Sequence, residues 1–313
     1  MEPALDPPNA DTAGQAIHAI RGYEYQILAA TLAWIDLEEN GLIYLEVAED
    51  YAHVLEGDIE AVQVKATRGS GVVTLNTPAV RDAIESFVKL AGQNPSREVQ
   101  LRFLTTAPIG LEKSPSDRPD ELPGLEYWQR ARAGREDVGL LRTMLERESS
   151  PEAVRTFCRI RTDEEILVDL IRRVTWDCGR PETPTLRREL EERVSLFLRE
   201  EFGVPLREAL SFADVLASRV LQRSAMKNVQ DRVLSRRELY QLADSSTRVS
   251  LPRTDFERLV KKVVASPDTS TSTYALVSAR SPVFPPWIVD AANIPTPKRI
   301  FIAGFQKNPC RSA

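Results

Sequence analysis

The chain has 313 residues, of which 42% are hydrophobic and 28% charged, an ordinary globular composition that argues against a wholly disordered protein. Its 41 basic and 46 acidic residues give a net charge of −5, so bulk electrostatics would not hold it to nucleic acid and any DNA contact must be local. No apolar run reaches the ~18 residues that span a bilayer, and the N-terminus lacks the order of a signal peptide, so a cytoplasmic protein without membrane contact is expected.

Cysteine, histidine and motif content exclude several classes of protein. The three cysteines, Cys158, Cys178 and Cys310, lie far apart without C-x-x-C spacing, so we expect reduced thiols and neither a disulfide framework nor a zinc site. Two histidines are too few for mechanisms that use several imidazoles. The sequence has no G-x-S-x-G and no G-x-x-x-x-G-K-[ST] motif, which excludes a serine hydrolase and a P-loop ATPase.

The first part of the chain predicts one long helix. Residues 1–13 are rich in proline and aspartate and are expected to form a mobile N-terminus. Between residues 14 and 40, apolar side chains at i, i+3 and i+4 mark one helix face: Ile17, Ile20, Ile27, Leu28, Thr31, Trp34 and Ile35. The spacing places Glu24 near the centre of this face and Gln26 on a second face of small residues, so either polar side chain is a candidate for a site.

Two antiparallel strands are expected next, over residues 42–54 and 59–67. The turn between them contains Gly57, which can take the positive φ that a tight turn needs.

Alternation along these strands brings polar groups together. In the second strand, Gln63 and Lys65 share one face. In the first strand, Glu46 and Asp50 share a face, and a turn near residues 55–58 brings residue 50 opposite about residue 63. A carboxylate, an amide and an amine can therefore converge, although a polar-faced edge strand with a solvent lysine is the alternative interpretation.

The rest of the chain predicts mostly helices. Residues 77–92 have helical spacing, with Thr77 and Pro78 as the start, and residues 98–107 alternate as a further strand. Three prolines among charges predict a linker over 112–124. Helical spacing then covers 125–149, 151–160, 163–175, 184–202, 205–223 and 235–243. The expected fold class is an α/β (α+β) domain over residues 14–115, an all-α domain over 116–260, and a proline-containing C-terminal extension over 261–313.

Arginines in the predicted helical region have two interpretations. Helices of mixed charge usually solvate their outer faces. The same side chains are also candidates for a phosphate-contacting surface: Arg130, Arg132, Arg135, Arg142 and Arg147.

The converging polar groups fit the hydrolysis of a phosphodiester. This reaction needs an oxygen-rich pocket for Mg²⁺ or Mn²⁺, which neutralises the charge that develops on phosphorus. Asp50 would be the metal ligand, with the side-chain carbonyl of Gln63 and the backbone carbonyl of Val64 as weaker ones. Lys65 would orient or deprotonate the attacking water, or stabilise the phosphate by its charge.

An acid followed after twelve residues by Q-x-K resembles the PD-(D/E)xK restriction-endonuclease-like superfamily, in the Q-x-K branch of the Mrr-type nucleases. The stretches GYEYQ (22–26), EVAED (46–50), AVQVKAT (61–67) and FLTTAPIG (103–110) are similar to the double-stranded DNA endonuclease domain of bacterial anti-phage systems, including CD-NTase-associated (CBASS) effectors. More loosely, TWD (175–177) and LSRRELYQLAD (234–244) are similar to its helical part. The resemblance implies Asp50, Gln63 and Lys65 as the metal and catalytic set, and Gln26 at a position that is a glutamate in many Mrr-like enzymes.

With this resemblance, the sequence predicts a Mg²⁺-dependent endonuclease that cleaves double-stranded DNA as an effector of anti-phage defence. Gln26 leaves the metal site poorer in charge unless Glu24 or Glu46 compensates. No cyclic-nucleotide sensor or ATPase motif is recognisable, so the family's switch is missing or lies on another polypeptide. Two alternatives stay open: a DNA-binding subunit with a degenerate site, and a scaffold for a partner ATPase.

The acidic net charge further predicts self-association. One weakly basic active face binds DNA weakly. Several protomers around a duplex would bind it more tightly, because the first contact raises the effective concentration of the others. A homo-oligomer is therefore the expected active state.

Overall fold

The computed structural model describes residues 17–66, 71–203 and 209–247. In these ranges one six-stranded mixed sheet forms, made of β1 (Leu42–Leu45), β2 (Tyr51–Leu55), β3 (Asp58–Lys65), β4 (Val99–Thr105), β5 (Val174–Cys178) and β6 (Val233–Ser235). The strand order is β5-β4-β3-β2-β1-β6. Strands β3, β4 and β5 pair in parallel, whereas β3, β2, β1 and β6 pair antiparallel. The sheet therefore changes from antiparallel to parallel pairing at β3.

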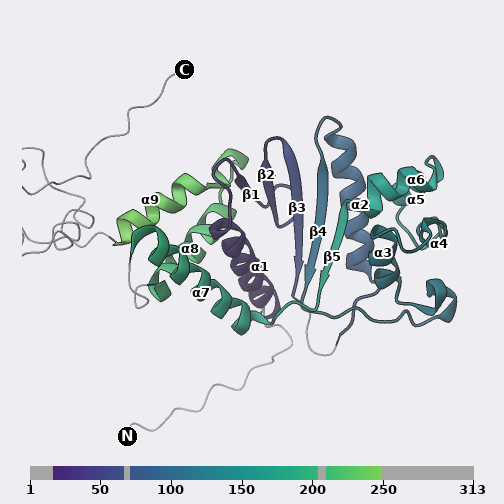
Figure 1. The fold of residues 1–313 in the computed structure, drawn as a ribbon, viewed down its shortest axis with the longest axis horizontal. Helices are drawn as coiled ribbons and strands as arrows, with labels where there is room; N and C mark the ends of the chain where they lie inside the picture. Colours follow the sequence, from purple (N-terminus) through teal and green to yellow (C-terminus); the bar gives the residue numbers. More distant parts are fainter. Residues whose placement is uncertain (1–16, 67–70, 204–208, 248–313) are drawn as a thin grey trace, which may run out of the picture. The chain divides into compact units, whose positions relative to one another are not determined.

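Two groups of helices cover the two faces of this sheet (Figure 1). On one side lie α1 (Ile17–Ile35), α7 (Thr183–Phe202) and α8 (Ala209–Ser224). On the other lie α2 (Pro78–Gln93), α3 (Gly124–Arg132), α4 (Val138–Leu145), α5 (Glu152–Arg159) and α6 (Asp163–Ile166). A π-helical turn, η4 (Leu167–Ile171), short 3-10 turns, η2 (Pro115–Asp117), η3 (Pro119–Glu121) and η6 (Val229–Asp231), and α9 (Arg236–Thr247) complete the described elements. None of these helices is long and apolar enough to cross a membrane.

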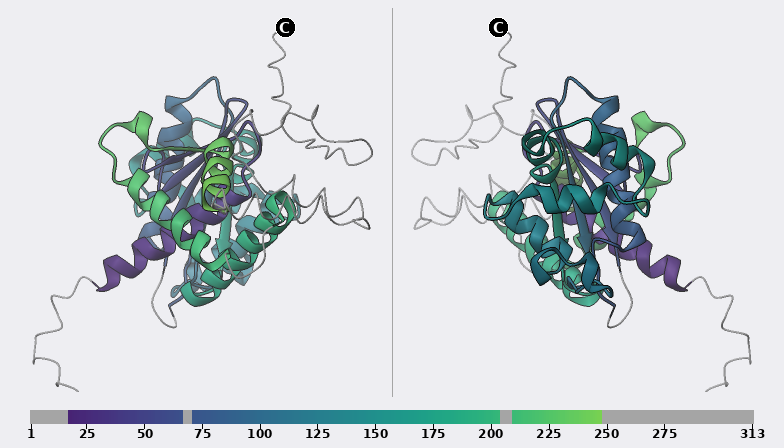
Figure 2. Two further views of the ribbon diagram at one scale, coloured as in Figure 1. Left: turned by 90° about the vertical axis from the view of Figure 1, so that its left-hand side faces the viewer. Right: turned by 90° about the vertical axis from the view of Figure 1, so that its right-hand side faces the viewer.

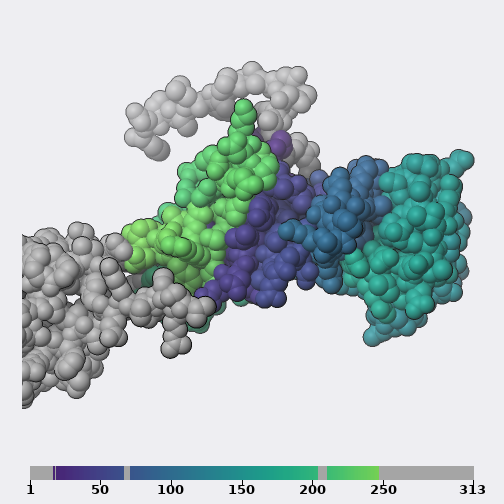
Figure 3. All heavy atoms as spheres, turned by 90° about the horizontal axis from the view of Figure 1, so that it is seen from above, coloured from purple at the N-terminus to yellow at the C-terminus, as the bar shows by residue number. Residues whose placement is uncertain are grey.

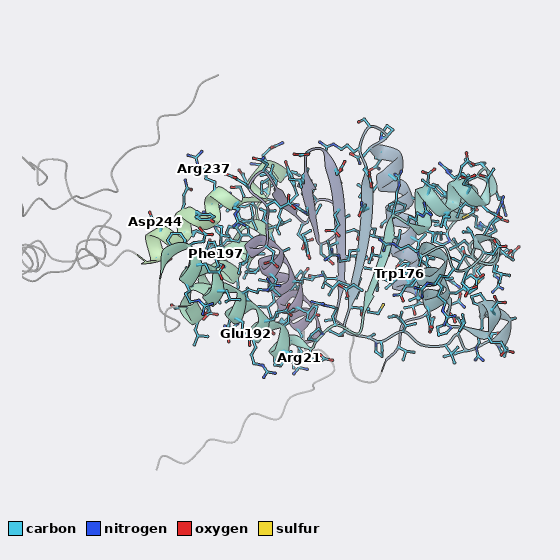
Figure 4. The ribbon with its side chains drawn as sticks, in the orientation of Figure 1. Arg21, Trp176, Glu192, Phe197, Arg237 and Asp244 are labelled. Atoms are coloured by element: carbon cyan, nitrogen blue, oxygen red, sulfur yellow. The ribbon has the colours of Figure 1, made fainter. Side chains whose placement is uncertain are left out.

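The larger core packs between β3, β4, β5 and the helices α2 to α6. The ring of Trp176 on β5 meets Phe103 on β4 edge-on at 5.6 Å between centroids, and Trp128 on α3 at 5.4 Å. All three rings are buried, and Trp176 lies where β5 meets these helices (Figure 4). Large buried aromatic rings contribute much of the apolar burial of a core, so β5 and α3 share one core with β3 and β4.

The predicted strand over residues 42–54 is wrong in its middle, because β1 and β2 are two strands joined by a turn at 46–50. The pair Leu45 and Tyr51 closes this turn, and the Glu46 N–H donates to the carbonyl of Asp50 at 3.0 Å. Glu46 and Glu49 have φ values of 53° and 63°, outside the extended region. The predicted alternation of Glu46 with Asp50 on one strand face therefore does not arise.

The predicted turn between the second and third strands is confirmed. Leu55 pairs with Asp58, so the turn has two central residues, Glu56 and Gly57, with φ values of 51° and 103°. Positive φ at both central positions is the signature of the hairpin turn that matches the twist of the strands. Helix α2 and strand β4 also form where helical and alternating spacing predicted them.

The prediction of an all-α region over 116–260 is wrong at two places, because β5 and β6 come from it. Strand β5 adds to β4 in parallel, and β6 adds to β1 antiparallel. The predicted linker over 112–124 is also anchored: the buried carboxylate of Glu112 accepts hydrogen bonds from the amides of Leu75 at 3.1 Å and Gly124 at 3.0 Å. The described residues up to Gln241 form one compact unit. The predicted mobile N-terminus, the extension over 261–313 and Cys310 lie outside the described residues.

Candidate active site

Asp50 lies where the antiparallel ladder of β2 and β3 ends. Tyr51 and Val62 form the last regular pair of this ladder. The next amide of β3 that points toward β2 is that of Val64, and it donates to Oδ2 of Asp50 at 2.6 Å. The carboxylate thus takes the place of a strand partner, which keeps a buried backbone donor satisfied.

Gln26 on α1 holds the second carboxylate oxygen. Its Nε2 donates to Oδ1 of Asp50 at 2.7 Å, and its side chain is half-buried. Two donors from different elements therefore fix the orientation of Asp50. The contact joins Gln26 to Asp50, and the place of Gln26 in a functional site stays a prediction.

The expectation that Glu24 faces inward is wrong, since its side chain is exposed. The first turns of α1 project beyond the neighbouring helices (Figure 2), and Arg21 marks this end in Figure 4. Ile20 and Tyr23 in the same turns are 63% and 60% exposed. The apolar spacing that predicted a buried face is therefore satisfied only from about Tyr25 onward.

Gln63 and Lys65 lie on one face of β3, and Asp50 lies in the turn just before β2, where it accepts the Val64 amide. The Lys65 charge acts on the Asp50 carboxylate, and the convergence of both groups with Gln63 stays a prediction. The Oε1 atom of Gln63 is buried and has no hydrogen-bond partner among the described residues. A buried acceptor without a partner is uncommon and calls for a missing cation, water or donor.

Three neighbouring carboxylates have raised pKa values. Burial raises the pKa of Asp50, against the opposing effects of the Val64 amide, the Lys65 charge and the Gln26 amide. Burial likewise raises the pKa of Glu49, assisted by the charge of Asp50 and opposed by the Ser86 hydroxyl and Lys65. The charged form is therefore costly here, and a positive charge placed among these groups would relieve that cost.

Sequence reasoning predicted poorly where the Glu49 and Glu46 side chains lie relative to Asp50. A continuous strand would have turned Glu49 away from Asp50, whereas in the turn the two carboxylates and Lys65 interact. Partial burial and the charge of Asp50 raise the pKa of Glu46, which Arg232 opposes. The signal in the sequence is the acidic run EVAED itself.

The donor set fits Mg²⁺ or Mn²⁺ bound mainly through water and substrate. These ions prefer oxygen ligands, and Mg²⁺ in particular is often held by one or two carboxylates plus phosphates. Asp50 supplies a carboxylate and Gln63 an unpartnered carbonyl oxygen. The carbonyl of Val64 points to the same side of β3 as its amide, toward Asp50. In the described part of the chain no group of three or more His, Cys, Asp or Glu residues is arranged to hold a metal, so the protein contributes few charged ligands.

The arginines predicted to form a phosphate-contacting surface are largely engaged in contacts with other residues of the same chain. Arg130 pairs with Glu126 and Glu136, Arg142 with Glu146 and Asp163, and Arg147 with Asp117. Arg132 donates to the hydroxyl of Thr175. These contacts favour the interpretation of solvated, internally paired helix faces.

No family model matches the chain, and no curated protein matches it. Among solved structures, the chain is similar to the Moraxella osloensis Cap4 SAVED/CARF-domain containing receptor, at 14% sequence identity and a TM-score of 0.41. The similarity covers 82% of this chain and 66% of the receptor chain, just under two thirds.

These findings overturn the assignment to the PD-(D/E)xK restriction-endonuclease-like superfamily. No family model matches the chain, so no model of that superfamily does. The assignment rested on a short acid and Q-x-K spacing, and the acid lies at the end of a turn instead of within a long strand. What the site can do is therefore argued from the geometry around Asp50.

Proposed function

We propose that this protein is a metal-dependent endonuclease that hydrolyses phosphodiester bonds of double-stranded DNA, with Asp50, Gln63 and Lys65 as its active residues. The proposal is carried by one observation: the Asp50 carboxylate, whose pKa is raised, feels the charge of Lys65 where the β2–β3 ladder ends, and on the same strand Gln63 has a buried carbonyl oxygen with no partner among the described residues.

Each residue has a distinct role in this proposal. A bound Mg²⁺ or Mn²⁺ would polarise the phosphate and lower the pKa of a bound water. Asp50 and Oε1 of Gln63 would hold the ion, with the Val64 carbonyl as a further oxygen. Gln26 is a positioning residue, because its amide fixes the Asp50 carboxylate. Lys65 would stabilise the negative charge that develops on the phosphate as water attacks.

The reaction breaks one ester bond. The water oxygen loses a proton to solvent and forms a bond to phosphorus, the P–O bond to the leaving sugar oxygen breaks, and that oxygen takes up a proton from solvent. The charge of Lys65 matters most in the transition state, because only there do the phosphate oxygens and the leaving oxygen gain charge together.

The test is a cleavage assay with the full chain, on plasmid and linear DNA, with Mg²⁺, Mn²⁺ or EDTA. We expect cleavage with either metal and none in EDTA. Lys65→Ala and Asp50→Ala should each lower the rate by roughly 10²–10⁴-fold, the range for losing a charged group in a hydrolytic site. Lys89→Ala is the matched control, since Lys89 is an exposed lysine on α2 that pairs with Glu85. Cleavage that survives both active-site changes would refute the proposal.

A DNA-binding subunit without catalysis is the second candidate. It is favoured by the hydrogen bonds that already occupy both oxygens of Asp50 and by the amide of Gln26 where a further charged ligand would help. It predicts DNA binding that Asp50→Ala leaves unchanged and no cleavage with either metal. A scaffold role for a partner ATPase or a nucleotide sensor on another chain, and a role in anti-phage defence, stay predictions.

Self-association belongs to the proposal as well. With a net charge of −5 the chain has little bulk attraction for DNA, so several protomers would be needed to hold a duplex. We expect light scattering to show an oligomer at concentrations where cleavage occurs. An active monomer would contradict this expectation.

A further inference from the structure

A hollow of about 480 Å³ opens directly beside Asp50. Its walls come from α1, from the ends of β1 and the 46–50 turn, from α8 and from the segment before β6: Tyr23, Gln26, Ile27, Ala30, Leu45, Glu46, Asp50, Val220, Leu221, Ser224, Ala225 and Arg232. Figure 3 shows the segments that contain α1 and α8 lying against each other. The volume lies within the ~300–1,000 Å³ of small-molecule sites, so the hollow is large enough for an organic group.

One side of the hollow is aromatic and apolar. Tyr23 is 60% exposed and Leu221 is 55% exposed, and both line the opening. Ile27, one helical turn after Tyr23, continues this side inward. A solvated aromatic ring beside an apolar wall is the arrangement on which nucleic-acid bases stack.

The other side of the hollow is polar, and hydrogen bonds from Arg232 hold it in place. Arg232 donates to the backbone carbonyls of Glu46 at 2.9 Å, Met226 at 2.7 Å and Lys227 at 3.3 Å. These bonds tie the segment before β6 to the 46–50 turn. They also fix the position of Glu46, whose backbone is in the left-handed region at φ 53°.

The charges decide what the hollow can accept. Glu46, Asp50 and Arg232 line it; the Arg232 guanidinium is bonded to three backbone carbonyls, and the two carboxylates disfavour further negative charge nearby. Without a bound cation, a phosphate group would be repelled from these two carboxylates, whereas a ligand edge with N–H donors would be attracted. Carboxylates accept hydrogen bonds from the exocyclic amino group of a base such as cytosine. The aromatic side and the two carboxylates therefore match a nucleobase better than a phosphate or an aliphatic chain.

We propose that this hollow receives the base of a nucleotide next to the scissile phosphate, turned out of the DNA stack. The inference rests on the proposed function and deepens it, because Asp50 belongs to both sites: the phosphate would lie at Asp50 and its neighbouring base between Tyr23 and Glu46. A base within a duplex is closed in by its neighbours and reaches such a hollow only by leaving the stack. The preferred substrate is then DNA with an unpaired or easily unpaired nucleotide at the cut.

The first test compares two substrates with the full-length protein. Tyr23→Ala is expected to lower kcat/KM on DNA about tenfold more than on bis(p-nitrophenyl) phosphate, a small diester without a base, since losing a stacking ring costs roughly tenfold or more. Tyr23→Phe, which keeps the ring, should behave like the wild type. Ile20→Ala is the matched control, because Ile20 is exposed on the same helix but does not line the hollow. Equal losses on the two substrates would overturn the inference.

The second test does not need cleavage. A 2-aminopurine is moved one position at a time through a duplex, with Ca²⁺ in place of Mg²⁺, and we expect its fluorescence to change on binding at one position only, in a manner lost in Tyr23→Ala. No change at any position would overturn the inference. So would a free mononucleotide that competes as strongly as DNA, since the hollow would then serve a separate ligand. If the wild type cleaves neither substrate, the proposed function fails while this binding test still decides the inference.

Discussion

Replacing Gln26 by glutamate tests whether the centre around Asp50 is built for a cation. Nε2 of Gln26 lies 2.7 Å from Oδ1 of Asp50, so Gln26→Glu puts a second carboxylate in place of a hydrogen-bond donor. Taking the two charges as about 4 Å apart with an effective dielectric constant of about 20, their repulsion is about 4 kcal/mol. This corresponds to about three pKa units on one of the two groups.

The expected pH dependence follows from this repulsion. A carboxyl whose pKa is raised in the folded protein keeps a proton that the unfolded chain releases above about pH 4. Stability relative to the wild type should therefore fall as the pH rises from about 4 toward the raised pKa, and stay low above it. Thermal unfolding of Gln26→Glu and wild type, both in EDTA, between pH 5 and pH 8 measures this difference.

Metal should reverse the effect. A divalent ion bound between two carboxylates removes their repulsion, and a ligand stabilises the folded state by RT ln(1 + [L]/Kd). Mg²⁺ should therefore raise the unfolding temperature of Gln26→Glu more than that of the wild type. Gln100→Glu is the matched control, because the Gln100 amide also donates to a carboxylate, that of Glu98, but on an exposed surface. If Mg²⁺ stabilises Gln26→Glu no more than the wild type or the control, the metal interpretation of Asp50 is refuted.

Three further predictions follow from single contacts. Burial raises the pKa of Asp50, so Mn²⁺ affinity measured by calorimetry should fall with decreasing pH from a point above about 4, the ordinary aspartate value, and an affinity independent of pH between 4 and 7 would contradict this. Glu112→Gln leaves an amide group facing the N–H donors of Leu75 and Gly124, and urea unfolding should show a loss of about 2–4 kcal/mol; a loss below about 0.5 kcal/mol would mean that this carboxylate does not anchor the segment. Gly57→Ala forces an alanine to a φ of 103° and should destabilise by about 1–2 kcal/mol, whereas unchanged stability would show that the turn relaxes.

The part of the site that sequence predicted is the part set by local rules. Gly57 marks the turn, and its two central residues fix the register that places Tyr51 opposite Val62. These relations need only strand alternation and turn chemistry. They place the start of β2, which follows Asp50, beside the end of β3 that carries Gln63 and Lys65.

Local sequence rules did not predict the turn at 46–50. Its sequence EVAED holds no glycine, proline or asparagine, yet Glu46 and Glu49 adopt positive φ. A contact from Arg232, 186 residues away, holds the carbonyl of Glu46. Such a conformation is imposed by tertiary contacts, which is why alternation wrongly predicted a continuous strand here.

Strand β5 shows a different limit. Its sequence VTWDC does alternate, with Val174 and Trp176 buried. It lies between segments with strong helical spacing, however, and its parallel partner β4 is about seventy residues earlier, with α3 to α6 between them. A pairing that depends on so long a crossover leaves little trace in a local window.

The change of pairing at β3 explains why a costly carboxylate is kept. On one edge β3 continues alongside β4 to Lys65, but on the other edge β2 stops at Tyr51 and leaves the Val64 amide without a strand partner. Asp50 fills that gap, yet two hydrogen bonds and a lysine do not offset its burial, since its pKa stays above the ordinary value. A neutral side chain with an acceptor would satisfy the Val64 amide at lower cost. Among the described residues the Gln63 oxygen also lacks a partner, and a cation bound in this gap would offset the cost of both groups.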